Sequence, residues 1–119
     1  MEPLVRTGLL YDFYGGLLTA KQRKVMELYF LEDWSLAEIA SEESVSRQAV
    51  HDLIHRCARM MEEYESKLGL MERFICQQAE LNGICTKLAE LLQQLEKDSP
   101  IYQSLNEIKL KIEKLLENE

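Results

Sequence analysis

The sequence contains little glycine and proline, with five Gly and two Pro in a chain of 119 residues. These residue types mark the tight turns between strands, so a chain poor in both has little room for a β-sheet. The hydrophobic content of 46% is ample for a core at this length. The composition therefore favours an all-α protein, built as one compact domain or as a small domain with a helical extension.

Long apolar runs are also lacking. No stretch of about eighteen apolar residues occurs, so we expect no transmembrane helix and no membrane insertion. The start, Met1-Glu2-Pro3, lacks the basic segment that opens a secretory signal. Cys57, Cys76 and Cys85 are odd in number and show neither metal nor redox spacing, which suits a reducing compartment. We therefore expect a cytoplasmic protein.

Enzyme motifs are missing too. The sequence has no nucleophile elbow, no phosphate-binding loop and no glycine-rich dinucleotide turn. His51 and His55 have the spacing that can place two imidazoles on one metal ion, but the HExxH motif is absent and solvent-facing histidines explain the pair as well. We expect no catalytic residue, no bound metal and no cofactor.

The sequence also lacks an excess of basic residues. Fourteen Lys and Arg stand against twenty-one Asp and Glu, a net charge of −7. Phosphate neutralisation supplies most of the affinity of DNA-binding proteins, so this balance opposes strong non-specific binding. The segment from Arg47 to Arg59 reverses the sign locally, with three Arg and one Asp. A weak nucleic-acid contact steered by a few residues remains compatible with the sequence, provided that the acidic remainder faces away.

The segment from Ser35 to Arg56, SLAEIASEESVSRQAVHDLIHR, has the pattern of a helix-turn-helix. Ser35 followed by Glu38 three residues later is a capping box. It predicts a short helix from Leu36 to about Ser41, followed by a tight turn through residues 42–45. Most of what the sequence indicates about function depends on this segment.

The second helix of this motif is predicted to begin after the N-cap Ser46. On a helical wheel its polar half contains Arg47, Gln48, His51, Asp52, His55, Arg56 and Arg59. The opposite half contains Ala49, Val50, Leu53, Ile54, Cys57, Met60, Met61 and Tyr64. Arg, Gln and His donate hydrogen bonds to phosphates and base edges, although any amphipathic surface helix has a polar face. The candidate nucleic-acid-binding residues are Arg47, Gln48, His51, His55, Arg56 and Arg59, with the first two placed for bases and Arg56 for a phosphate.

Three stretches carry a family resemblance. They are residues 18–23 (LTAKQR), 28–40 (LYFLEDWSLAEIA) and 46–52 (SRQAVHD). They resemble region 4 of bacterial sigma factors and, more closely, the YlxM-type family of small bacterial proteins. The likeness continues through residues 61–68 and covers more than half of the chain.

The resemblance implies a sigma region 4-like helix-turn-helix without the other sigma domains. It also implies a regulator associated with the signal recognition particle pathway, largely through gene neighbourhood. One departure is Glu43-Ser44, where a hydrophobic residue and a Gly or Asn are usual. A turn residue with positive φ favours Gly or Asn, and Ser44 stands at that place.

The residues before the motif predict two more helices. The first runs from about Leu4 to Tyr14 and is broken by Gly15-Gly16. The second is capped by Thr19 and runs through Leu31. Trp34 follows in the connection, where we expect it to anchor the core.

After Gly69 the pattern changes to heptads. Two apolar stripes repeat at alternating spacings of three and four: Leu81, Ile84, Leu88, Leu91 and Leu95, then Ile101, Leu105, Ile108, Ile112 and Leu115. Ser99 and Pro100 mark the start of the second helix. The stripes form either a hairpin within one chain or arms that join two chains, and we expect a homodimer. The candidate interface residues are Leu88, Leu91, Leu95, Leu105, Ile108 and Ile112. The expected domains are 1–69 and 70–119.

Two classes of function follow. In the first, the chain is a DNA-binding regulator that takes part in the signal recognition particle pathway. In the second, it binds no nucleic acid and contacts a protein or RNA component of that particle through its acidic surface and helical arms. The sequence leaves DNA and RNA undistinguished.

Overall fold

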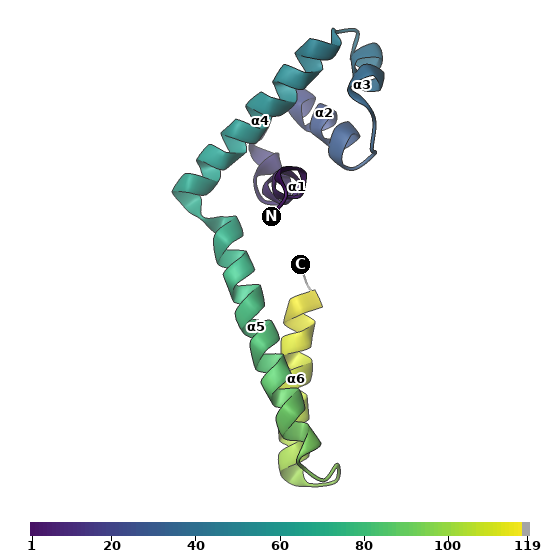
Figure 1. The fold of residues 1–119 in the computed structure, drawn as a ribbon. Coiled ribbons are helices and arrows are strands. Elements are labelled where there is room, and N and C mark those ends of the chain that lie inside the picture. Colours follow the sequence, from purple (N-terminus) through teal and green to yellow (C-terminus); the bar gives the residue numbers. More distant parts are fainter. Residues whose placement is uncertain (118–119) are drawn as a thin grey trace. The chain divides into compact units, whose positions relative to one another are not determined.

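The computed structural model describes residues 1–117, and these residues form helices joined by short connections, with no strand among them (Figure 1). The elements are α1 (Pro3–Tyr14), η1 (Gly15–Leu17), α2 (Ala20–Phe30), α3 (Leu36–Glu43), α4 (Arg47–Leu68), α5 (Leu70–Gln93) and α6 (Pro100–Glu117). The all-α prediction is therefore confirmed. Within the described residues, no helix combines the length and the hydrophobicity that crossing a membrane requires.

The chain divides into two compact units, Met1–Met71 and the residues from Glu72 onward. The domain division expected from the sequence stays a prediction. The first unit contains α1 to α4 and the first turn of α5.

The starts of α2 and α3 follow from local side-chain chemistry. Thr19 Oγ1 accepts a hydrogen bond from the Gln22 backbone N–H at 3.2 Å, and the Gln22 side chain accepts one from the Thr19 N–H at 2.9 Å. Ser35 and Glu38 form the same reciprocal pair at 3.1 and 2.9 Å. Each capping box satisfies two backbone donors that have no partner inside the helix.

α1 starts with Pro3, whose fixed φ suits a first helical turn. The helix ends at Tyr14, where η1 turns the chain. A Cβ on Gly15 would lie 2.8 Å from the Tyr11 ring, so a larger residue here would require that side chain to move. The helix ends immediately before the glycine pair, as the sequence indicates.

The core of the first unit is assembled around α4, which packs against α1, α2 and α3. Its buried members are Leu10, Tyr14, Leu18, Val25, Met26, Ile39, Ala40, Val50, Ile54, Cys57, Met61 and Met71. Trp34 is half-buried and packs against this cluster. One face of α4 is buried against the other helices of the unit, so the opposite face of α4 is exposed.

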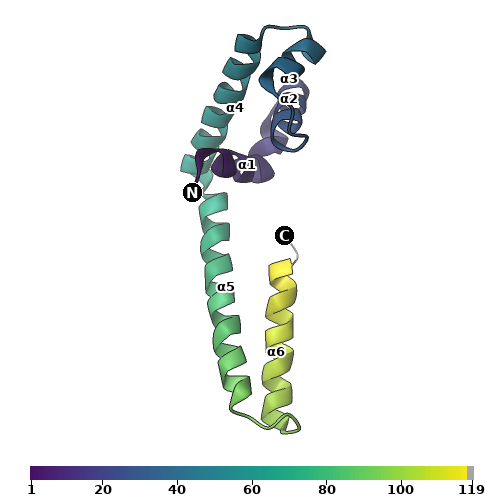
Figure 2. The same cartoon turned by 45° about the vertical axis from the view of Figure 1, so that its right-hand side comes forward.

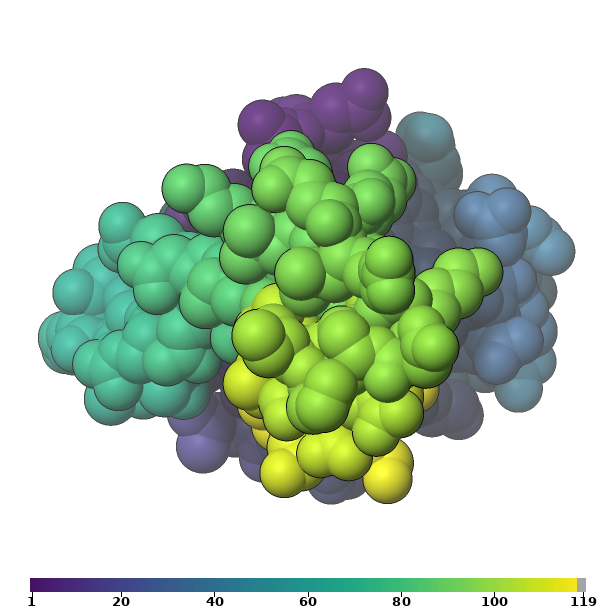
Figure 3. Space-filling model, turned by 90° about the horizontal axis from the view of Figure 1, so that it is seen from below, coloured from purple at the N-terminus to yellow at the C-terminus, as the bar shows by residue number. Residues whose placement is uncertain are grey.

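The second unit is a helical hairpin. α5 and α6 lie side by side and antiparallel in both ribbon views (Figures 1 and 2). Figure 3 looks onto the end of this hairpin that the α5–α6 connection closes. The connection ends at Ser99, whose Oγ accepts the Tyr102 backbone N–H at 3.2 Å, so Ser99 caps α6 as expected.

Candidate nucleic-acid interface

The turn between α3 and α4 is short and well bonded. The Val45 N–H donates to the Ala40 carbonyl at 3.0 Å, and Ser44 adopts the left-handed conformation with φ 56° and ψ 42°. Ser44 thus takes the conformation that Gly or Asn adopts at lower cost. The tight turn therefore forms with Ser44 at this position, and α3 continues to Glu43 rather than ending at Ser41.

Ser46 positions the first turn of α4. Its Oγ accepts the backbone N–H of Ala49 at 3.0 Å, which makes Arg47 and Gln48 the first two helical residues. Both side chains are exposed. They lie at the positive end of the helix dipole, where an anion is favoured. The start of α4 therefore presents two exposed hydrogen-bond donors at the positive end of the helix dipole.

The next turn contains a carboxylate among the basic groups. Asp52 accepts a hydrogen bond from the Gln48 side-chain amide at 2.9 Å. This bond, followed by the contact with His51, lowers the pKa of the Asp52 carboxyl. Asp52 therefore stays ionised, and its carboxylate accepts one of the two side-chain N–H donors of Gln48.

His51 and His55 stack on each other with ring centroids 4.0 Å apart. Nδ1 of His55 lies 2.9 Å from the backbone carbonyl of His51. A carbonyl only accepts, so the proton is on Nδ1 and Nε2 remains available as an acceptor in the neutral ring. In the part of the chain that the structure describes, no three His, Cys, Asp or Glu side chains gather closely enough to hold a metal ion.

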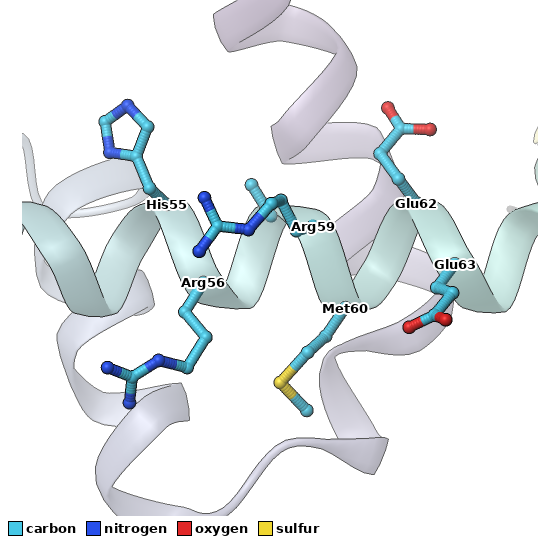
Figure 4. A pocket seen from close by; sticks show the side chains of 7 residues that line it. His55, Arg56, Arg59, Met60, Glu62 and Glu63 are labelled. Carbon is cyan, nitrogen blue, oxygen red and sulfur yellow. The ribbon is translucent and has the colours of Figure 1, made fainter.

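A shallow hollow of about 690 Å³ lies along the following turns of α4. It is lined by His55, Arg56, Ala58, Arg59, Met60, Glu62 and Glu63. Figure 4 shows His55 and Glu62 projecting from one edge of the helix and Arg56 from the other, with Arg59 between them. The two glutamates lie one turn beyond Arg59, so the basic character of this face ends there. The candidate interface is thus a short one.

Glu62 is already paired. Its carboxylate accepts hydrogen bonds from Nε and from one terminal nitrogen of Arg6 at 2.5 and 2.8 Å. These bonds lower the pKa of the Glu62 carboxyl. Arg6 comes from α1, 56 residues earlier in the chain. The pair ties α1 to α4 beside the hollow, and no local sequence signal indicates it.

The opposite face of α4 is packed. Val50, Ile54, Cys57 and Met61 are buried at helical spacing. Burial raises the pKa of the Cys57 thiol, so it remains a neutral core side chain. Ala49, assigned to the apolar half, is exposed because it lies at the edge of that half and outside the packed stripe. The six candidate nucleic-acid residues lie on the polar side, and among them only His51 is partly covered.

The six candidate interface residues of the hairpin fall into two groups. Leu88 is buried, and Leu95, Leu105 and Ile112 are half-buried. Leu91 and Ile108 are 48% and 47% exposed. The heptad pattern therefore contains both residues covered within the chain and residues left open.

The comparisons with known proteins agree on one family. Residues 1–103 match the model of the UPF0122 family, described as "Putative helix-turn-helix protein, YlxM / p13 like". A UPF0122 protein of Halalkalibacterium halodurans is 49% identical over 96 residues, which cover 81% of this chain and 78% of the relative.

Two further relatives extend over nearly the whole chain. A UPF0122 protein of Bacillus velezensis is 45% identical over 111 residues, covering 91% of this chain and 97% of the relative. One of Anoxybacillus flavithermus is 44% identical over 115 residues, covering 97% and 98%. The resemblance to the YlxM-type family is thereby confirmed. This chain belongs to the UPF0122 family of YlxM/p13-like helix-turn-helix proteins.

Proposed function

We propose that the protein is a DNA-binding regulator that contacts its site through the polar face of α4. The membership in a helix-turn-helix family supports this proposal. The observation that carries it is the exposure of Arg47 and Gln48 on the first turn of α4, beside a packed and capped turn. In helix-turn-helix proteins this turn of the second helix enters the major groove.

The side chains of this face would contact different parts of the duplex. Arg47 and Gln48 would read base edges, where each bidentate contact contributes about 1–3 kcal/mol of discrimination. His51, His55 and Arg59 would continue the contact along the groove. Arg56 projects from the other edge of the helix and would bind a phosphate (Figure 4). With a net charge of −7, the affinity would rest on these few groups.

The pathway and the location are also proposals. We place the protein in the cytoplasm and in the signal recognition particle pathway, as the resemblance to the YlxM-type family implies. We propose no catalytic role, since the family is described as helix-turn-helix.

A second candidate is a protein-interaction role through the hairpin. Ile101, Ile108 and Leu115 are 62%, 47% and 59% exposed and repeat every seven residues along α6. An exposed stripe of this kind is typical of a helix that packs against another chain. We propose that it joins two copies in a homodimer, or contacts a component of the signal recognition particle.

The test is fluorescence anisotropy with a labelled duplex DNA and a labelled RNA hairpin. Arg47→Ala removes the positive charge on the first residue of α4. Lys67→Ala removes a positive charge about 30 Å further along the same helix and is the control. We expect DNA binding at low salt that is weakened by Arg47→Ala and retained in Lys67→Ala. An RNA preference would reassign the ligand, and no binding of either would support the protein-interaction role.

A further inference from the structure

The first unit has two neighbouring apolar hollows between α1 and the end of α2. Their volumes are about 290 and 330 Å³. One is lined by Leu4, Val5, Gly8, Leu9, Tyr11, Asp12, Phe30 and Leu31, and the other by Leu4, Val5, Tyr29, Phe30, Asp33 and Trp34. The shared walls Leu4, Val5 and Phe30 make them one groove with two compartments. We call it the α1–α2 groove.

Large apolar side chains are exposed on this groove. Leu4, Val5 and Leu31 are 61%, 53% and 65% exposed. Exposed apolar side chains that gather around a groove mark a candidate interaction surface. The groove uses none of the candidate nucleic-acid residues of α4.

Gly8 keeps the groove open. It lies in the middle of α1, where glycine weakens a helix relative to alanine. A Cβ at this position would meet nothing within 4 Å, so no packing contact requires the glycine. Gly8 lies one turn from Leu4 and from Asp12, on the face of α1 that lines the groove, so helical spacing places a side chain at this position over the groove.

The charge of the groove is negative. Asp12 lines one compartment and Asp33 the other, and neither compartment is lined by a Lys or Arg. Arg6 of α1 is engaged with Glu62 on α4. Carboxylates at the rim repel nucleic-acid phosphates and anionic lipids, and they attract Lys and Arg side chains.

We propose that the α1–α2 groove binds an amphipathic basic helix of a partner protein. Two apolar side chains of that helix, three or four residues apart, would enter the two compartments. Lys or Arg residues flanking them would pair with Asp12 and Asp33. This is the helix-in-groove mode of recognition.

The probe is a synthetic helical peptide with Leu on one face and Lys on the other, without tryptophan. Trp34, the single Trp of the chain, lines the groove and gives an intrinsic fluorescence signal. We expect saturable binding with a dissociation constant of about 1–100 μM, in the range of small transient interfaces. The same peptide with Glu in place of Lys should bind about tenfold more weakly.

The blocking variant is Gly8→Gln, which fills the groove and improves the helix propensity of α1. Its matched control is Gly83→Gln, at another helical glycine whose Cβ would meet open space. Gly8→Gln should raise the dissociation constant of the Lys peptide about tenfold or more, and Gly83→Gln should leave it unchanged. The double variant Asp12→Asn, Asp33→Asn should raise it about threefold to tenfold.

Three results would overturn the proposal. The first is equal binding of the Lys peptide by the wild type and by Gly8→Gln. The second is equal binding of the Lys and Glu peptides by the wild type. The third is a wild-type dimer in sedimentation velocity that Gly8→Gln converts to a monomer, because a second copy would then occupy the groove. Nucleic-acid binding is measured separately, so failure here leaves the role of α4 untouched.

Discussion

The phenolic hydroxyl of Tyr14 donates a 2.5 Å hydrogen bond to the carboxylate of Glu65, across 51 residues of sequence. The same hydroxyl accepts the backbone N–H of Leu70 at 3.2 Å, and Oε1 of Glu65 accepts that of Met71 at 3.0 Å. Tyr14 and Glu65 are both buried. Burial and the bond to Glu65 raise the pKa of the Tyr14 hydroxyl, so it stays a donor. The pair thus satisfies the first backbone donors of α5 and ties them to α1.

Removing the Tyr14 hydroxyl should destabilise the first unit. Tyr14→Phe removes one of the hydrogen-bond donors to the buried Glu65 carboxylate and the side-chain acceptor of the Leu70 N–H, at a cost of about 2 kcal/mol. Urea unfolding followed by circular dichroism measures this loss. Tyr11→Phe is the matched control, because its hydroxyl bonds the exposed Glu27 and should contribute about 0.5 kcal/mol or less. Equal losses in the two variants would contradict the structural role of the Tyr14 pair.

Ser44 offers a stabilising substitution. Its φ of 56° is costly for a residue with a side chain, so Ser44→Gly should raise the free energy of unfolding by about 0.5–1 kcal/mol. Ser41→Gly, inside α3, should lower it by about 0.5 kcal/mol. Thermal unfolding of both variants checks the contrast. A loss of stability in Ser44→Gly would show that the turn does not require the left-handed conformation.

The pair of Arg6 and Glu62 predicts a pH dependence of stability. The hydrogen bonds of Arg6 lower the pKa of the Glu62 carboxyl in the folded state. Their contribution is therefore complete above the unfolded pKa of about 4.3 and is lost as the pH falls through the folded value. Both side chains are partly exposed, at 39% and 44%, so the contribution at pH 7 should be only about 0.5 kcal/mol.

The measurement is the difference in unfolding free energy between the wild type and Glu62→Gln at several pH values. The difference should be constant from pH 6 to 8 and should shrink below about pH 5. A difference that grows on acidification would have the wrong sign for this pair.

The hairpin predicts a contrast between two positions of α6. Leu105 is half-buried in the hairpin, whereas Ile108 is 47% exposed. Leu105→Lys should reduce helix content, because it places a charge in the seam. Ile108→Lys should keep the helix content and, if two copies pair through this stripe, convert a dimer to a monomer in sedimentation velocity. Dimerisation unaffected by Ile108→Lys would contradict the proposed dimer.

The helix starts could be predicted because their causes are local. Thr19 and Ser35 bond groups only three residues away, so the sequence contains both partners of each capping box. The polar face of α4 was equally predictable, because its periodicity separates packed from exposed positions. The six candidate residues follow from that periodicity, and their contact with nucleic acid stays a prediction.

Pairs between distant residues could not be predicted. Nothing near Arg6 or Tyr14 in the sequence indicates Glu62 or Glu65, because these contacts exist only once α1 packs on α4. The heptads have a similar limit. Leu88 and Leu91 belong to the same apolar stripe, yet Leu88 is buried and Leu91 is 48% exposed. Which residues are covered depends on how the two helices pack.

The most direct test of the proposed function is the salt dependence of duplex binding in the wild type, Arg47→Ala and Lys67→Ala. Arg47 is assigned to base edges, so Arg47→Ala should weaken duplex binding by about 1–3 kcal/mol at each salt concentration, whereas loss of a phosphate contact would also lower the slope of log K against log salt by about one. Lys67→Ala should keep the wild-type slope. Identical slopes and affinities for all three proteins would contradict the assignment of the α4 polar face as the nucleic-acid interface.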